Sequence, residues 1–336
     1  MIAAARNLPD VEDVRLAVVE DDGRFVACLP FHHIQSGLRS VSPISYKTAT
    51  SRIRRMNYLG TPLIDPAGGL EATTKLIETV AAECRSEGSY AAELWDVAAG
   101  GPVDGYLREA AASLGLPLVV TETFDRGFLH QGDAEALPAG SAETIQNLRD
   151  KRRSLGRALG DEVVLVDRTD DEAIDDYVRL EASGYKSEFG VSMTTFPGER
   201  EFFSEMCRSF VADGRMHFLS LMAGDTTMAM VVWIDAGDSV FQFKWSYDHS
   251  FAEYSPGLQV LLAGIEHFRE KTDFAMLDTC TGDGIDFVLA MYPARRTLNL
   301  YRLVVQDRLR DRMRVKFVDE SRDLRDRVRK LTPRSE

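Results

Sequence analysis

The sequence has few cysteines and no motif that would organise them. Its four cysteines stand far apart along 336 residues, and none belongs to a Cys-x-x-Cys pair. Neither a zinc ribbon nor a disulfide framework is therefore indicated, and reduced, buried thiols are expected. The six histidines lack a His-Glu-x-x-His spacing, and His32-His33 is more simply a pair in a loop than a metal site. We expect no metal.

Long apolar runs and nucleotide-binding glycine motifs are also missing. No stretch of about 18 apolar residues is present to span a membrane, and residues 1–16 lack the apolar segment of a signal peptide. The sequence has no Gly-x-Gly-x-x-Gly motif after a strand and no P-loop, so it fits neither a dehydrogenase nor a nucleotide hydrolase well. A formal net charge of −13 argues against a general nucleic-acid binder. These features predict a cytoplasmic protein.

The N-terminal part alternates between strand and helix patterns. Two apolar runs around Asp22-Gly23 predict a β-hairpin. Apolar residues at spacings of four, Leu76, Val80 and Cys84, predict a helix over residues 69–88. A strand, a helix and another strand follow up to residue 124, whereas residues 31–62 are mixed and turn-rich. This order predicts an α/β fold.

A small, polar segment at residues 130–143 indicates a boundary. Beyond it, three apolar runs from 215 to 248 predict an antiparallel meander, followed by a helix and the strands 274–280 and 294–305. We predict domains at 1–135 and 136–306. A charged helix is predicted at 307–336. Its packed side is expected to carry Leu309, Met313, Phe317, Leu324 and Val328.

One stretch, WSYDHSFAEYSPGLQVLLAGIEHF (residues 245–268), changes from an aromatic strand to an amphipathic helix at Ser255-Pro256-Gly257. The first turn of a helix has open N–H groups and a partial positive charge, which suit a phosphate. Gly257 would let a ligand approach the backbone, Pro256 suits a helix start, and Ser255 could cap the helix or bind a phosphate oxygen. A helix start without a ligand explains the same residues.

Three strands, this turn, a helix and one more strand resemble the acetyltransferase-like (GNAT) fold. Three segments also resemble an acyltransferase family described as cellulose-biosynthesis-like, a bacterial relative of the Fem peptidyltransferases. They are LEASGYKSEFG (180–190), FKWSYDHSFAEYSPG (243–257), and LDTC followed by AMYPARR (277–296). The resemblance covers residues 140–305 well and 10–130 more loosely. Tyr185 and Tyr292 replace tryptophans of the family pattern, and Ile285 stands where a histidine is usual.

The resemblance implies tandem acetyltransferase-like (GNAT/Fem-like) domains, the first degenerate, with mixed sheets flanked by helices. It implies an acyl-CoA co-substrate such as acetyl-CoA. Its diphosphate would lie at Ser255, Pro256, Gly257, Leu258 and Gln259, and its pantetheine arm between the splayed strands on either side of the helix. The acceptor, an amine of a small molecule or sugar, would enter a groove between the domains. Tyr185, Tyr247, Asp248 and Tyr292 would bind it.

Four residues are candidates for the chemistry of direct attack by an amine. Asp278 ends an apolar strand, where burial would suit it to proton transfer, although a strand-end Asp also caps turns. Glu181 and Lys186 could form an ion pair, either at the surface or in a pocket. Lys244 would share one face of its strand with Gln242 and Ser246, either lining a substrate groove or facing solvent.

Two other functions remain open. The basic helix at 149–157 could bind the 3′-phosphate of coenzyme A, an anionic acceptor or tRNA, or could simply be solvated. With aminoacyl-tRNA as donor, the protein would be a Fem-like aminoacyltransferase. The replaced histidine would suit a degenerate binding or scaffold protein that uses the C-terminal helix for contacts. A homodimer is also possible.

Overall fold

The structure, a computed structural model, describes most of the chain: residues 2–8, 14–37, 44–52, 60–133, 141–183, 190, 192–281, 286–292, 294–306 and 308–331. The chain forms two compact units. The hairpin unit comprises Asp13–Thr123 and Thr297–Glu336, and the meander unit comprises Met1–Glu12 and Phe124–Arg296. Both units are discontinuous in sequence, whereas the domains predicted at 1–135 and 136–306 are contiguous. Two strands, β6 (Leu118–His130) and β12 (Ala294–Val304), begin in one unit and end in the other.

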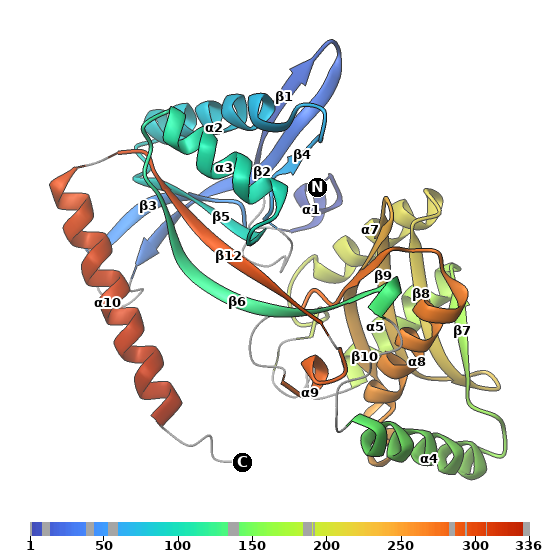
Figure 1. The fold of residues 1–336 in the computed structure, drawn as a ribbon. Coiled ribbons are helices and arrows are strands. Elements are labelled where there is room, and N and C mark those ends of the chain that lie inside the picture. The colour runs from blue at the N-terminus through green and yellow to red at the C-terminus, as the bar shows by residue number, and fades with distance from the viewer. Residues whose placement is uncertain are drawn as a thin grey trace. The chain divides into compact units, whose positions relative to one another are not determined.

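The hairpin unit is a mixed sheet with helices (Figure 1). Its further elements are β1 (Arg15–Asp21), β2 (Arg24–Gly37), β3 (Ser45–Thr50), β4 (Leu63–Ile64), α2 (Gly69–Ser86), β5 (Ala91–Ala98), α3 (Pro102–Ser113) and α10 (Leu309–Leu331). The strand order is β1-β2-β3-β5-β12-β6, with β4 on β2; β3 and β5 run parallel. Asp22 and Gly23 have positive φ in the predicted hairpin turn.

The helices of this unit follow the periodicity of their apolar residues. Leu76, Val80 and Cys84 are all buried on α2, as predicted, and pack with α3 against β2 and β5. The strand β3 falls in the segment that was expected to be turn-rich. β3 is short and reads SYKTAT, so it shows no alternation of large apolar and polar side chains.

The C-terminal helix α10 packs through a different face from the predicted one. Val315 and Val318 are buried against Tyr46 and Tyr90. The predicted packing residues Leu309, Met313, Phe317 and Leu324 are instead exposed. Position 328 lies on the helix, but its side chain is outside the described residues. The prediction was wrong because period alone does not say which of two apolar faces meets the sheet.

The meander unit contains the remaining elements. They are α1 (Ile2–Asn7), η1 (Gln131–Asp133), α4 (Ser141–Leu159), β7 (Val164–Arg168), α5 (Asp171–Ser183), α7 (Glu199–Ala212), β8 (Met216–Ala223), β9 (Thr226–Ala236), β10 (Ser239–Tyr247), η2 (His249–Tyr254), α8 (Pro256–Lys271), β11 (Met276–Asp278) and α9 (Asp286–Leu289). The strand order is β6-β11-β10-β9-β8-β7, and the β10–β11 pair is parallel whereas the others are antiparallel.

Helices cover both faces of the meander sheet (Figure 1). On one face, α8 packs through Val260 and Ile265 against residues such as Trp233. On the other, α5 and α7 pack on Met230 and Val232. α4 lies on α8, where Ile145 and Leu148 contact Leu262. The mixed strand order within each unit, flanked by helices, confirms the predicted α/β class.

The sequence predicts neither a membrane-spanning helix nor a metal site, and the described part of the chain bears on both. None of its helices combines the length and apolar character that a membrane crossing requires. No cluster of three or more metal-binding side chains occurs in the same ranges.

His32 and His33 lie on β2 rather than in a loop. His32 Nε2 is 3.0 Å from the Arg52 carbonyl and His33 Nδ1 is 2.7 Å from Ser89 Oγ.

A histidine near the start of β8 makes stability depend on pH. His217 Nδ1 is 2.8 Å from Asp167 Oδ2. This hydrogen bond and the Asp235 charge raise the pKa of His217 against the opposing effect of burial. The stabilisation is complete below the ordinary histidine pKa and disappears as the pH rises through the raised value.

His217→Gln is therefore expected to lower the free energy of unfolding more at about pH 6 than at about pH 9. Urea unfolding of both proteins at the two pH values measures the difference. An equal loss at both would contradict a charged His217.

Candidate functional site

The predicted turn begins α8. Ser255 adopts a left-handed conformation with φ +57° and joins η2 to α8, and Pro256 occupies the first helical position. The Ser255 carbonyl accepts hydrogen bonds from the amides of Leu258 and Gln259, both at 3.1 Å. The Ser255 side chain does not cap the helix. The positive end of the α8 dipole is thus not occupied by this hydroxyl.

A lysine from α4 lies at this turn. Lys151 Nζ donates to Ser255 Oγ at 2.8 Å, which adds a full positive charge to the partial charge of the helix end. Other basic residues of α4 contact different groups: Arg149 pairs with Glu266 and Arg152 donates to the Val163 carbonyl. The sequence indicated a basic helix but not which of its residues would reach the turn.

A glycine at position 257 is required for packing within the protein. A Cβ at this position would lie 2.9 Å from atoms of both the Trp245 and the Tyr247 rings. The missing side chain therefore lets α8 pack on β10, rather than opening the backbone to a ligand as the sequence suggested. Gln259 is also buried, and its Nε2 donates to the Tyr254 carbonyl at 2.7 Å. Leu258 packs with the α4 cluster.

Gly257→Ala is expected to destabilise the protein by about 1–3 kcal/mol, because the new methyl group overpacks two aromatic rings. Chemical denaturation measures the loss. Gly105→Ala, at a helical position with open space around it, is the control and should be neutral or stabilising. Equal effects of the two substitutions would contradict the packing role.

The strands on either side of α8 separate as predicted. β10 and β11 pair only from Ser239↔Met276 to Phe241↔Asp278. β10 then continues to Tyr247, and no strand among the described residues follows it on the β11 side. Alternate backbone N–H groups of β10 point toward this side. The arrangement places backbone donors along a gap that starts beside Asp278.

A β-bulge at Phe243 changes the predicted faces of β10. Gln242 lies opposite Trp233, whereas Lys244 lies opposite Val232, so Phe243 is the extra residue. Trp233 belongs to the core under α8 and Val232 to the core under α5 and α7. Gln242 and Lys244 therefore face opposite sides of the sheet, and the prediction that they share one face was wrong.

Lys244 meets a buried carboxylate from α5. Its Nζ is 3.5 Å from Glu181 Oε1, and the Glu181 side chain is only 1% exposed. Glu181 Oε2 accepts from the Met193 amide at 2.8 Å and from Ser192 Oγ at 3.3 Å. The predicted pocket residues Glu181 and Lys244 are thus brought together beside the bulge. Tyr185, Lys186 and Ile285 lie outside the described residues.

Asp278 is held by two arginines at the end of β11. Its carboxylate is 3.7 Å from Arg126 Nη1 and 3.5 Å from Arg296 Nη1. It also accepts from the amide of Cys280 at 2.8 Å, and Cys280 has a φ of +49°. Asp278 therefore caps a turn and neutralises buried positive charge. Arg126 carried no signal in the sequence, because it is 152 residues away.

Three of the predicted substrate-binding residues make contacts within the protein. Tyr292 is fully buried, its hydroxyl donates to Gln242 Oε1 at 3.0 Å, and burial raises its pKa. Asp248 caps η2 by accepting from the Ser250 amide at 2.9 Å. Tyr247 packs beside Gly257. All three side chains therefore take part in the packing around the turn at Ser255 or the gap between β10 and β11.

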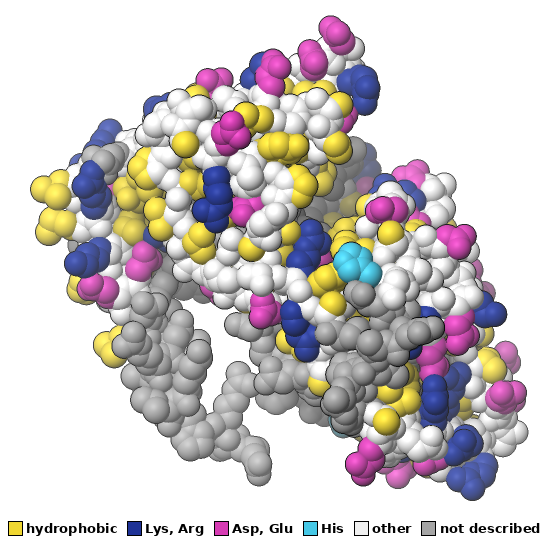
Figure 2. Space-filling model, in the orientation of Figure 1, with side chains coloured by type: hydrophobic (Ala, Val, Ile, Leu, Met, Phe, Trp, Pro, Cys, Tyr) yellow, Lys and Arg dark blue, Asp and Glu magenta, His cyan; other side chains and the backbone are white. Residues whose placement is uncertain are grey.

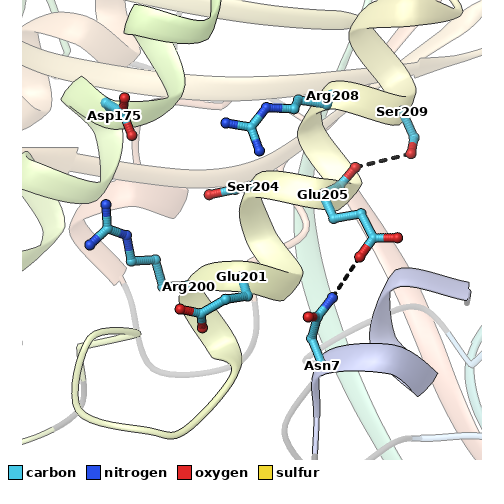
Figure 3. Close-up of a pocket in the computed structure, with 8 residues that line it drawn as sticks. All are labelled: Asn7, Asp175, Arg200, Glu201, Ser204, Glu205, Arg208 and Ser209. Atoms are coloured by element: carbon cyan, nitrogen blue, oxygen red, sulfur yellow. Dashed lines mark hydrogen bonds between the residues drawn. The ribbon is translucent and has the colours of Figure 1, made fainter.

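A surface hollow of about 720 Å³ lies elsewhere, along α7 (Figure 3). Arg200, Ser204 and Arg208 extend to the side of α7 that faces Asp175. On its opposite side, Asn7 donates to Glu205 at 2.7 Å. None of the predicted site residues lines this hollow. Its mixed charges favour a solvated surface over a phosphate site.

The sequence of the meander unit matches a known family. Residues 142–287 match the model of the acetyltransferase (GNAT) domain. The match begins in α4 and includes β10, the turn at Ser255, α8 and β11. The protein is an acyltransferase. No curated protein shows a significant similarity in sequence to the chain.

Solved structures extend the similarity to both units. A conserved protein of unknown function from Bacteroides thetaiotaomicron aligns with a TM-score of 0.57 and 9% identity, over 87% of this chain and 86% of the other. FemX aligns with a TM-score of 0.55 and 10% identity, over 87% of this chain and 88% of the other. L-PGS from Bacillus licheniformis aligns with a TM-score of 0.54 and 8% identity, over 93% of both chains. Identities this low show a shared fold alone, and the predicted tandem acetyltransferase-like, Fem-like fold is confirmed.

Proposed function

We propose that this acyltransferase moves an acetyl or other acyl group from coenzyme A to the amine of a small molecule or sugar, in the cytoplasm. The observation that carries the proposal is Lys151 at the start of α8, beside the gap between β10 and β11. We further assign the chain to the cellulose-biosynthesis-like type. In support, the motif residues Lys244, Tyr247 and Asp248 all fall on β10 or directly after it, before the turn.

The donor would bind with its diphosphate at the start of α8. Lys151 Nζ and the positive end of the helix dipole attract phosphate oxygens, and Ser255 Oγ can donate to one of them. The pantetheine arm would follow the gap that opens beyond Phe241. Backbone N–H groups of β10 would then stabilise the negative charge that develops on the thioester oxygen.

The acceptor would reach the same gap from the α5 side, where Lys244 and Glu181 lie. The amine nitrogen bonds to the carbonyl carbon as the carbon–sulfur bond breaks, and the thiolate leaves. The nitrogen loses a proton to the Glu181 carboxylate, and the thiolate then takes up a proton. Lys244, with Lys186 as a second candidate, would hold Glu181 in place. Asp278 would fix the two arginines at the end of β11.

An aminoacyl-tRNA donor is the competing proposal, and the contacts of α4 favour coenzyme A. Arg149 and Arg153 are paired with Glu266 and Asp150, which reduces the positive charge offered to a polyanion. Filter binding with charged tRNA, compared with calorimetry of acetyl-CoA, separates the two donors.

The assigned donor site predicts the effect of Lys151→Ala. Calorimetry should show coenzyme A binding about tenfold more weakly, because a charge-assisted hydrogen bond to phosphate is lost. Arg153→Ala, on the exposed side of the same helix, is the matched control and should leave the affinity unchanged. Equal affinities of wild type and Lys151→Ala would contradict the assignment.

A further inference from the structure

The exposed face of α10 carries an apolar stripe. Leu309, Met313 and Phe317 follow each other at intervals of four residues, and Leu324 continues the row one heptad later. They are 72%, 65%, 48% and 65% exposed, respectively. Their spacing places them on one side of the helix over more than four turns, with the exposed Glu320 between Phe317 and Leu324 on the same side. An apolar row of this length on a protein surface indicates an interaction site.

The opposite face of α10 is already anchored to the hairpin unit. Val315 and Val318 are buried against Tyr46 and Tyr90. Asp319 Oδ2 also pairs with Arg302 Nη1 at 2.8 Å. The helix is therefore held with its apolar stripe facing outward, so burying the stripe needs a partner that approaches from outside.

Basic residues flank the stripe on both sides. In a helix, each neighbour in sequence is rotated by about 100°. Arg310 and Arg314 follow stripe residues and lie on one flank, whereas Arg312 and Lys316 precede them and lie on the other. Residues 308–317 include five basic residues and one acidic residue, Asp311, which lies 3.7 Å from Arg310 and 4.0 Å from Arg314. Lys316 is 3.9 Å from Glu320. These long pairs between exposed side chains neutralise little, so the stretch stays basic although the whole chain is acidic. Figure 2 shows hydrophobic, basic and acidic side chains next to one another on the described part of α10.

We propose that α10 docks this protein on an anionic lipid surface. An apolar stripe between two rows of cations is the pattern of a helix that lies in a membrane interface, with apolar groups among the acyl chains and cations at lipid phosphates. The charge of such a surface complements both flanks at once. This proposal is independent of the acyl donor.

A second copy of the chain is a less suitable partner. Pairing two stripes in parallel would bring Arg310 and Arg314 of one copy beside the same residues of the other, and like charges repel. An anionic surface carries no such cost. The two partners differ in the experiment, because only self-association depends on protein concentration in the absence of lipid.

Vesicle flotation of the full chain tests the proposal. Binding is expected to vesicles that contain about one third phosphatidylglycerol and to weaken strongly at high salt, whereas pure phosphatidylcholine vesicles should bind about tenfold less. Met313→Ser and Phe317→Ser should each weaken binding about threefold to tenfold. Phe25→Ser, which removes a side chain from β2 that is even more exposed, at 72%, is the matched control and should bind like wild type.

Charge is tested separately with Arg310→Gln/Arg314→Gln, which should reduce binding by about tenfold or more. Lys75→Gln, an exposed cation on α2, should have no effect. Thermal unfolding verifies that each variant is folded. No vesicle binding, equal binding to both vesicle types, or a dimer that forms through Met313 and Phe317 without lipid would overturn the proposal.

Discussion

Glu181→Gln is expected to lower turnover by about 100- to 10,000-fold, the usual contribution of a positioned proton acceptor. Glutamine keeps the length of the side chain and can still accept from the Met193 amide, but it cannot take a proton from the amine. The affinity for coenzyme A should stay within about twofold, because the diphosphate site at Ser255 is separate. Release of coenzyme A from acetyl-CoA, measured against a panel of primary amines, gives the rate.

Glu201→Gln is the matched control for this substitution. Glu201 is an exposed carboxylate on α7 in the same unit, and its replacement should leave the rate unchanged. Lys244→Met should also reduce turnover, because Glu181 then loses the cation that holds it. A Glu181→Gln protein that unfolds like wild type and keeps most of its activity would show that another group takes the proton.

Arg302→Met is expected to destabilise the protein by about 3–5 kcal/mol, the largest stability effect that the described contacts predict. The Arg302 side chain is 8% exposed and pairs with Glu93 at 3.1 Å and with Asp319 at 2.8 Å. Without the guanidinium group, Glu93 is left as a buried charge with no compensating cation from this position. The free energy of unfolding in urea measures the loss.

Two comparisons show whether the loss comes from the buried charge. Arg24→Met removes an exposed arginine that pairs with Asp65, so it should cost less than about 1 kcal/mol. Arg302→Met combined with Glu93→Gln should recover part of the stability, since the unpaired carboxylate is then gone. If Arg302→Met costs no more than Arg24→Met, the buried network does not stabilise the fold.

The sequence was sufficient to predict those elements whose signal lies in a short stretch of the chain, such as a helical spacing of buried residues or a turn. Leu76, Val80 and Cys84 predicted α2, and Asp22-Gly23 predicted the first hairpin, because both signals lie within a few residues. The turn at Ser255 was also predicted from adjacent residues. The separation of β10 from β11 was expected only from the resemblance to the GNAT fold.

The remainder depends on distant partners. Lys151 and Ser255 are 104 residues apart, so no spacing in the sequence joins them. The bulge at Phe243 is set by pairing with β9, and a single extra residue reverses the face of every side chain beyond it. The packed face of α10 was predicted wrongly because Tyr46 and Tyr90, which cover Val315 and Val318, are far away in the sequence.

A crystal structure of the protein with coenzyme A tests the central claim most directly. We predict diphosphate oxygens within hydrogen-bond distance of Lys151 Nζ and Ser255 Oγ at the start of α8. The thiol should lie in the gap that opens beyond the Phe241–Asp278 pair. Coenzyme A bound with its diphosphate at any other part of the chain would contradict the account.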